Sequence, residues 1–135
     1  MIDRSSGRVL LRYHDRLGRW LQVGGHVDAA DRDVFATALR EATEETGLAD
    51  LAPGDQRAPI HLAIVSVPAN SREAAHEHLD VRYVLYTDQP EVARPESDRT
   101  PLRWLNIFEA IDLVADDNLE NCLRRVRDHR KKGGR

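Results

Sequence analysis

The chain has 135 residues, of which 41% are hydrophobic and 32% are charged. This length is enough for one domain with a buried core and too short for two ordinary domains. A formal charge of −3 and a pI near 6.1 argue against a surface that binds a nucleic acid polymer, because binding to the phosphate backbone needs a basic face.

Cysteine content and hydropathy argue against two further classes of protein. Cys122 is the only cysteine, so the sequence offers no internal disulfide, cysteine-based zinc site or redox pair, and a reducing cytoplasm is the compartment that fits best. No stretch approaches 18 apolar residues, and the first residues are polar and charged. We therefore expect neither a membrane span nor a secretory signal.

The first elements expected in the chain are two short strands. Residues 8–14 form an apolar run bounded by turn-forming residues on both sides, and residues 20–23 form a second extended segment. The following segment contains two glycines and several aspartates, which indicates a loop. Asp31 or Asp33 would suit the N-cap of a helix that follows this loop.

A helix is expected over residues 34–46, with Gly47 as its stop. Apolar residues recur along it at helical spacing, and Leu39 and Ala42 are expected to face inward. The helix also carries three glutamates that share one face at i, i+3 and i+4 and are expected to point the other way: Glu41, Glu44 and Glu45. Each close like-charge pair weakens an isolated helix by about 0.2–0.5 kcal/mol, so the arrangement indicates a cationic partner.

Two partners fit this acidic face. Three carboxylates after a Gly-Gly loop suit a hard divalent cation, because magnesium takes oxygen ligands and shares them with substrate phosphates. An exposed helix supported by pairs with Arg40 explains the same residues, so the glutamates by themselves are a weak signal.

The second half of the chain adds strands and helices. Residues 61–68 have the length and composition of a buried strand, and residues 76–87 alternate as a longer strand. A short strand at 102–105 precedes a helical pattern that begins near Ile107. Asp116-Asp117-Asn118 is expected to break that pattern into two helices.

The strand at 76–87 has two chemically different faces. One face is apolar and carries Leu79, Val81, Tyr83 and Leu85. The opposite face carries a polar row of His76, His78, Asp80 and Arg82. Alternate residues on one strand face converge, so this row could bind substrate phosphate or a further metal, or it could be a solvated strand face.

The run GGHVDAADRDVFATALREATEETGL at residues 24–48 resembles the signature of the Nudix hydrolases, G-x5-E-x7-R-E-U-x-E-E-x-G-U, where U is a bulky apolar residue. Its second half matches at Arg40, Glu41, Glu44, Glu45, Gly47 and Leu48. In the first half Asp31 stands at the glutamate position, and one extra residue separates it from Arg40. Asp31, Asp28 and Asp33 are the candidates to support Arg40 in place of that glutamate.

The resemblance implies an α/β fold, a Nudix-type α/β/α sandwich around a mixed β-sheet, as a single domain over residues 1–130. Residues 131–135 would form a disordered basic tail. The first strand is shortened to Met1-Ile2-Asp3, so either the true start lies upstream or a sheet edge is left open. An open edge favours a homodimer.

The resemblance also implies the reaction, which is hydrolysis of a nucleoside diphosphate linked to a moiety X, with Mg²⁺ or Mn²⁺. The metal ligands would be Glu41, Glu44, Glu45 and the backbone carbonyl of Gly24. Arg40 would orient the glutamates, and Glu41 is the first choice as general base.

Two points stay open at this level. Glu73 and Glu77 are alternative bases, and His76, His78, Asp80 and Gly25 are the expected contacts to a small nucleotide-type substrate. The alternative function is a non-catalytic nucleotide-binding sensor on the same scaffold. Such proteins lose signature glutamates or gain a DNA-binding domain, and neither feature is found in this sequence.

Overall fold

The structure is a computed structural model, and it describes residues 1–54 and 57–133, with side chains described as far as Lys131. Its strands and helices, in chain order, are β1 Ile2–Asp3, β2 Val9–His14, η1 Asp15–Leu17, β3 Arg19–Leu21, α1 Val34–Thr46, β4 Ala52–Pro53, β5 His61–Val67, β6 His76–Arg82, β7 Leu85–Thr87, η3 Pro90–Val92, β8 Leu102–Leu105, α2 Ile107–Leu113 and α3 Asp117–Gly133. α3 thus includes residues 131–133 of the expected tail, while residues 134–135 lie outside the described residues.

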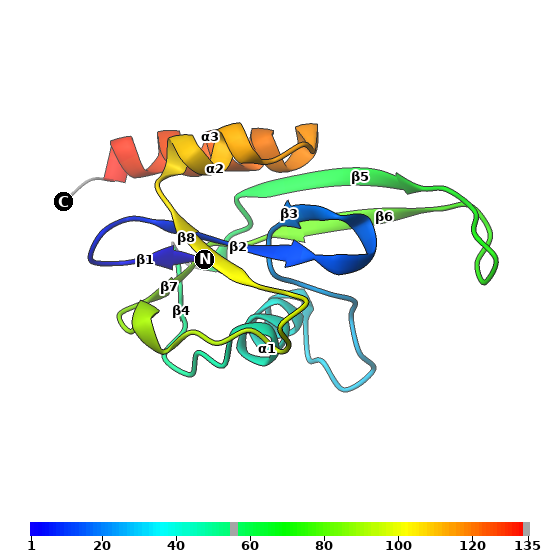
Figure 1. Cartoon of the computed structure of the whole chain (residues 1–135), viewed down its shortest axis with the longest axis horizontal. Coiled ribbons are helices and arrows are strands. Elements are labelled where there is room, and N and C mark those ends of the chain that lie inside the picture. The colour runs from blue at the N-terminus through cyan, green and yellow to red at the C-terminus, as the bar shows by residue number, and fades with distance from the viewer. Residues whose placement is uncertain (55–56, 134–135) are drawn as a thin grey trace.

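A mixed sheet forms the middle layer of the molecule. Its strand order is β3-β2-β1-β7-β4, with β8 paired to β2, and β1 runs parallel to β7 and antiparallel to β2. α2 and α3 lie on one side of this layer and α1 lies on the other (Figure 1). The expected α/β/α sandwich is therefore confirmed. Within the described residues, no helix is long and apolar enough to cross a membrane.

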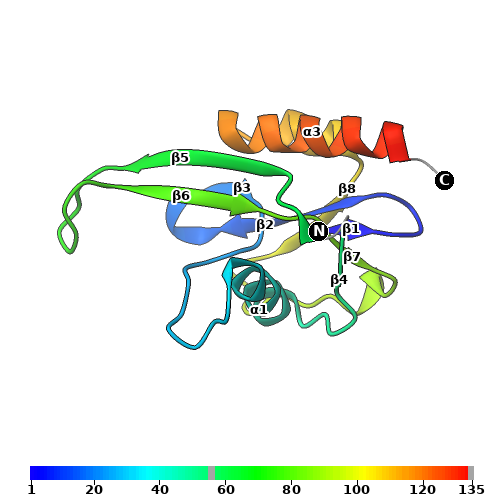
Figure 2. The same ribbon diagram turned by 180° about the vertical axis from the view of Figure 1, so that it is seen from behind.

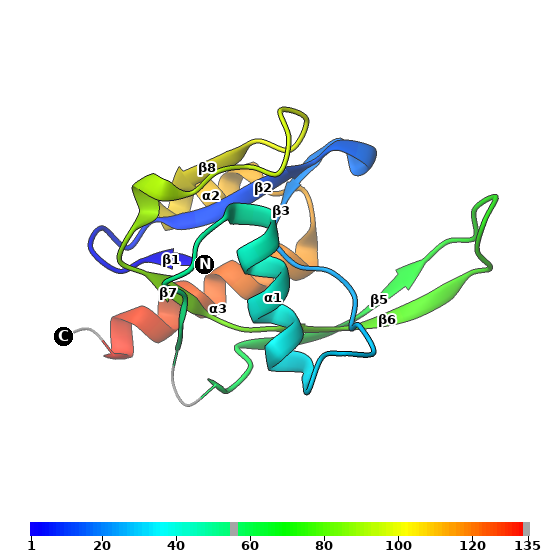
Figure 3. The same ribbon diagram turned by 90° about the horizontal axis from the view of Figure 1, so that it is seen from below.

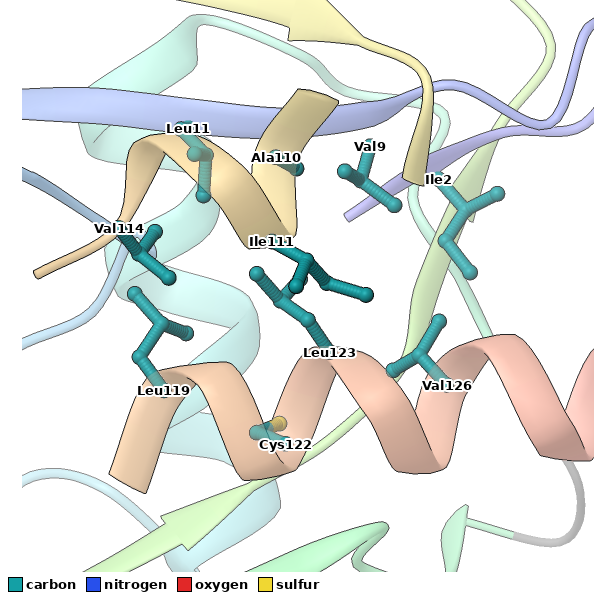
Figure 4. Close-up of a cluster of buried hydrophobic side chains, with 10 residues drawn as sticks. All are labelled: Ile2, Val9, Leu11, Ala110, Ile111, Val114, Leu119, Cys122, Leu123 and Val126. Carbon is teal, nitrogen blue, oxygen red and sulfur yellow. The ribbon is translucent and has the colours of Figure 1, made fainter. Parts of the chain in front are cut away.

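The core lies between the sheet and the two C-terminal helices. α3 contributes Leu119, Cys122, Leu123 and Val126, which lie beneath apolar side chains of β1, β2 and α2 (Figure 4). Each fully buried side chain of this kind stabilises the fold by about 1.5–3 kcal/mol. Cys122 is buried and unpaired, so its role here is packing.

The short first strand is not at an edge of the sheet. Ile2 pairs with Val9 on one side and with Tyr86 on the other, so β1 is an internal strand. The expectation of an open edge at Met1-Ile2-Asp3 is therefore wrong. Burial in the apolar interior lowers the pKa of the Met1 amino group to about 6.

α1 has the boundaries that its sequence predicts. The Asp33 side chain accepts a hydrogen bond from the Ala36 backbone N–H at 2.7 Å, and Gly47 ends the helix at φ 69°. The expected orientation is partly wrong, because Glu45 faces inward and is only 7% exposed, whereas Leu39 is half-buried. One of the three glutamates thus lies on the packed side of the helix.

β5 and β6 form a separate two-stranded ribbon. It pairs Leu62 with Val81 and Ile64 with Leu79, and it projects beyond the body of the molecule (Figures 1 and 2). The prediction that residues 61–68 form a buried strand is wrong, since Leu62 is 59% exposed and Ile64 is 67% exposed. The ribbon has this exposure because no second layer covers its outer face among the described residues.

The single strand expected over residues 76–87 is also corrected. β6 ends at Arg82 and β7 begins at Leu85, and the two strands belong to different sheets. The expected apolar face is divided as a result, because Leu79 is 67% exposed whereas Leu85 is 3% exposed. The polar row of β6 is the half-buried face, which points toward the body of the molecule.

Candidate active site

The candidate site lies where α1, the loop from Gln22 to Asp33 and strand β6 meet (Figure 3). α1 supplies the carboxylates, the loop supplies backbone groups, and β6 supplies imidazoles. Glu41 is half-buried, Glu44 is exposed and Glu45 is buried, so the three carboxylates differ in their access to solvent.

Arg40 ties the loop to the helix. Its Nε–H and Nη2–H donate to the two oxygens of Asp31 at 3.0 and 2.9 Å, and its Nη2 also donates to the His26 carbonyl at 3.0 Å. Its Nη1 donates to Glu41 at 2.8 Å and to Glu44 at 3.1 Å. These bonds hold the pKa of Asp31 well below its usual range and raise the pKa of Arg40.

The contacts decide which aspartate supports Arg40. Asp31 does so through a two-point contact, which is the stronger geometry for a guanidinium and a carboxylate. Asp33 instead caps α1, and Asp28 accepts from the Ala30 backbone N–H at 2.9 Å. The extra residue in the loop therefore leaves the support of Arg40 intact.

Glu45 is held by the glycine loop and by strand β2. It accepts the Gly24 backbone N–H at 2.9 Å and pairs with Arg12 of β2 at 3.2 Å. Burial is the largest effect on this carboxyl and raises its pKa. The ionised form of Glu45 is therefore less favourable in the folded protein than in water.

Arg12 and Glu96 belong to the site but were missed by sequence reasoning. Arg12 also donates to Glu96 at 3.0 Å, which brings a fourth carboxylate next to Glu45. A signal for Arg12 was present, because it is a charged residue inside the apolar run of β2. Nothing in the sequence around Glu96 marked it, because its position depends on how residues 93–101 fold back toward β2.

The two glycines of the loop are favoured for different reasons. A side chain at Gly25 would collide with the carboxyl group of Glu41, and Gly24 has φ 144°, where side chains are rarely tolerated. Backbone conformation therefore favours glycine at Gly24, and a side chain at Gly25 would have to displace the carboxyl group of Glu41.

The same side chains can be tested as a metal site. Among the residues that the structure describes, no three His, Cys, Asp or Glu side chains are arranged to hold a metal ion as they stand. Arg40 lies between Glu41 and Glu44, and Arg12 lies against Glu45. The donor set itself, carboxylates beside glycine backbone, has the oxygen chemistry that Mg²⁺ and Mn²⁺ prefer. The oxygen ligands of these residues therefore suit a hard cation. In this structure Arg40 and Arg12 neutralise the carboxylates instead.

The polar row of β6 is only partly brought to the site. His78 contacts the ring of His26, with ring centroids 5.0 Å apart, and its Nε2 lies 3.0 Å from Nε2 of His76. Asp80 instead pairs with Arg82 at 2.8 Å. His78 therefore lies against His26 of the glycine loop and His76 lies against His78, whereas Asp80 is held in an ion pair with Arg82.

A cavity of about 480 Å³ opens beside the glycine loop. Its walls include Gly24 to Val27 of the loop, Thr37 and Ala38 of α1, residues 77–82 of β6, and apolar side chains of the core. Two polar atoms of cavity-lining residues are buried without a hydrogen-bond partner, Oε1 of Gln22 and Nε of Arg82. The cavity is thus lined mainly by apolar residues, and two of its polar lining residues carry a buried atom without a partner.

Comparison with known families gives one assignment. The family profile described as NUDIX domain matches residues 1–126, which is most of the chain. No curated protein sequence matches this chain.

Three solved structures with a similar fold illustrate the likeness, each at low sequence identity. An Ap4A hydrolase from C. elegans is 18% identical with a TM-score of 0.66, and the match covers 94% of this chain and 90% of that one. The dihydroneopterin triphosphate pyrophosphohydrolase of E. coli is 15% identical with a TM-score of 0.71, and the match covers 92% and 88%. The NUDIX domain of Shewanella oneidensis NrtR, solved with ADP ribose, is 20% identical with a TM-score of 0.60, over 90% and 77%. At these identities the likeness establishes the fold.

Proposed function

The chain belongs to the Nudix family and is a Nudix-type hydrolase, and from this premise we propose that it cleaves a diphosphate linkage in a nucleoside diphosphate joined to a second moiety X. The products would be a nucleoside monophosphate and a phosphorylated X. The observation that carries the proposal is the Arg40 network, which joins Asp31, Glu41 and Glu44 and fixes the glycine loop against the acidic face of α1.

A divalent cation, Mg²⁺ or Mn²⁺, is part of the proposal. Its ligands would be Glu41, Glu44, Glu45 and the backbone carbonyl of Gly24. When bound, the cation supplies positive charge to the diphosphate oxygens and lowers the pKa of the attacking water. The desolvated Glu45 supports this assignment, because a carboxylate whose ionised form is disfavoured gains most from a strong counter-charge.

The remaining roles are assigned to side chains around this face. Glu41 takes the proton of the attacking water as general base, and Arg40 keeps Glu41 and Glu44 in orientation. Glu96 joins Glu73 and Glu77 as an alternative base, because it reaches the site through Arg12. His76, His78, Asp80 and Gly25 are the proposed contacts to substrate.

We further propose that the cavity beside the glycine loop holds one end of the substrate. Its volume of about 480 Å³ lies within the range of ligand pockets, roughly 300–1,000 Å³. The buried Oε1 of Gln22 has no partner, and a substrate N–H or O–H would satisfy it. The diphosphate would then lie at the cavity mouth, next to Gly24 and Gly25.

The direct test is a screen of nucleoside diphosphate derivatives with Mg²⁺ and with Mn²⁺, in which phosphate is measured after a coupled phosphatase. Nucleotide sugars, ADP-ribose, dinucleotides, coenzyme conjugates and nucleoside triphosphates form the panel, and Glu44→Gln is the matched control. Turnover of at least one compound that is lost in Glu44→Gln supports the proposal. Tight binding of a nucleotide without turnover would favour the sensor function instead.

Assembly and compartment are also proposals. A homodimer could use the exposed apolar face of the ribbon, where Leu62, Ile64 and Leu79 are 59%, 67% and 67% exposed. Sedimentation of Ile64→Lys against the unchanged protein tests this interface. A reducing cytoplasm is proposed because the sequence contains a single cysteine.

A further inference from the structure

The imidazoles of β6 form a pair whose geometry is separate from the carboxylate face. His76 and His78 stand two residues apart on one strand, so their side chains share a face of the ribbon. Their cross-strand partners on β5 are Val67 and Val65, which carry no side-chain hydrogen-bonding groups. The two rings therefore have each other as polar neighbours on this face, with Nε2 atoms 3.0 Å apart.

One hydrogen bond sets the tautomer of His76. Its Nδ1 lies 2.8 Å from the Ala74 carbonyl, and a carbonyl oxygen can only accept, so Nδ1 carries the proton. With that proton on Nδ1, the Nε2 of His76 carries the lone pair, which accepts the Nε2–H of His78. An imidazole whose other nitrogen donates to a backbone carbonyl is in the state that binds metal ions in proteins.

The spacing of the two nitrogens also suits a metal. Two nitrogens bound to one tetrahedral ion at roughly 2.0–2.1 Å lie about 3.3 Å apart. The observed separation of 3.0 Å needs only a small adjustment to reach that value. An ion bound to both nitrogens would lie to one side of the line that joins them and would replace the shared proton, and the displaced proton of His78 would move to its Nδ1.

We propose that His76 and His78 form a two-histidine clip for a divalent transition-metal ion such as Zn²⁺, Ni²⁺ or Cu²⁺. Imidazole nitrogen suits these ions, whereas Mg²⁺ prefers the oxygen ligands of α1, so the two positions would take different metals. The remaining coordination positions fall to water or to oxygen atoms of a bound ligand. Both rings are half-buried and open to solvent, which leaves room for these ligands.

His26 supplies a matched control within the same cluster. Its ring lies edge to face against His78, but no hydrogen bond orients either of its nitrogens toward the pair in the contacts described. Its backbone carbonyl accepts from Arg40, and a side-chain substitution leaves that contact in place. His26→Asn therefore removes an imidazole next to the clip without removing a proposed ligand.

The test is calorimetric titration of the full chain with Zn²⁺ in the presence of excess Mg²⁺, so that the carboxylate face does not compete. We expect one Zn²⁺ per chain, at least about tenfold weaker binding in His76→Ala and in His78→Ala, and retained binding in His26→Asn and Glu44→Gln. Visible absorption of bound Co²⁺ gives an independent readout of nitrogen ligation. Circular dichroism and melting curves establish that each variant is folded.

Several results would overturn the clip. Zn²⁺ binding that survives His76→Ala and His78→Ala would show that other residues hold the ion. Loss of binding in Glu44→Gln but not in His78→Ala would assign the ion to α1. Absence of Zn²⁺ binding in the folded, unchanged protein would mean that the two imidazoles merely share a proton.

Discussion

Helix α1 and the β5–β6 ribbon form two sides of the candidate site, but different forces hold them in place. α1 is capped at both ends, buries Ala42 and Glu45, and is tied through Arg40 to the loop and through Arg12 to β2. The ribbon has an outer face with Leu62 and Ile64 largely exposed. A site gains precision from rigid elements, whereas few buried contacts favour local opening. We therefore expect α1 to hold the reacting groups in place and the ribbon to adapt its position to the ligand.

The largest effect is expected from the carboxylates of α1. Glu44→Gln and Glu45→Gln should each lower turnover at least about a hundredfold, because each removes a charged oxygen ligand proposed for the cation. Steady-state kinetics on the substrate found in the screen measure this. Near-normal turnover in either variant would contradict the metal assignment. It would also mean that α1 does not contribute more to the chemistry than the β5–β6 ribbon does.

Glu45→Gln also has an expected effect on stability. A carboxyl whose pKa is raised in the folded state is most favourable when protonated, and its contribution is lost as pH rises through the folded pKa. At neutral pH the uncharged glutamine avoids that cost, so the melting temperature of the metal-free variant should be equal to or higher than that of the unchanged protein. A marked decrease would mean that the pair with Arg12 outweighs burial.

The next largest effect is expected from the contact between Asp31 of the loop and Arg40 of α1. Asp31→Asn should destabilise the fold, because it leaves Arg40 without its two-point partner, and it should also lower turnover. Denaturant unfolding measures the stability. Asp28→Asn, in the same loop, is the control and should change stability much less. Equal losses in both variants would show that the loop as a whole, and not the Arg40 contact, is responsible.

A divalent cation should stabilise the folded protein by binding to the carboxylates of α1 and not to the ribbon. Millimolar Mg²⁺ or Mn²⁺ should raise the melting temperature, because a ligand bound only by the folded state stabilises it, by about 2.7 kcal/mol at a hundred times its Kd. The rise should be absent in Glu44→Gln and present in His78→Ala. A shift that is the same in all three proteins would indicate binding elsewhere.

A smaller kinetic effect is expected from the ribbon. His78→Ala should raise KM or lower kcat by about tenfold with little change in stability, because this half-buried side chain covers little apolar area. Asp80→Asn is the comparison, since Asp80 lines the same cavity but is held in an ion pair with Arg82. If Asp80→Asn has the larger kinetic effect, the substrate lies farther along β6 than proposed.

The smallest effect concerns pH at the base of the ribbon. His61 is buried, its Nδ1 lies 3.0 Å from Nη1 of Arg82, and burial lowers its pKa below the ordinary 6.5. Its stabilising contribution is therefore fully present above about pH 6.5 and is lost as pH falls toward the lower folded value. His61→Asn should flatten this part of the stability profile. An unchanged slope would assign the pH dependence to other groups.

Much of the architecture could be predicted because its signals are local. The stop at Gly47 and the break at Asp116-Asp117-Asn118 depend on backbone conformations and capping within a few residues. The burial of β5 could not be predicted, because alternation of residues says nothing about whether a second layer covers the strand. The exposed Ile64 and the buried Glu45 are the two clearest cases.

The sequence by itself determined the family, the α/β/α order of elements and the placement of Arg40, Glu41, Glu44 and Glu45 on one helix, since spacing along a helix fixes which side chains are neighbours. Only the tertiary structure decided that Asp31 and not Asp28 or Asp33 supports Arg40, and that Arg12 and Glu96 reach Glu45. The physical reason is that the Arg12 contacts join segments far apart in the chain, and that the choice of aspartate depends on how the loop folds back onto α1. Their geometry follows from how the loop and the strands pack, and no local pattern encodes it.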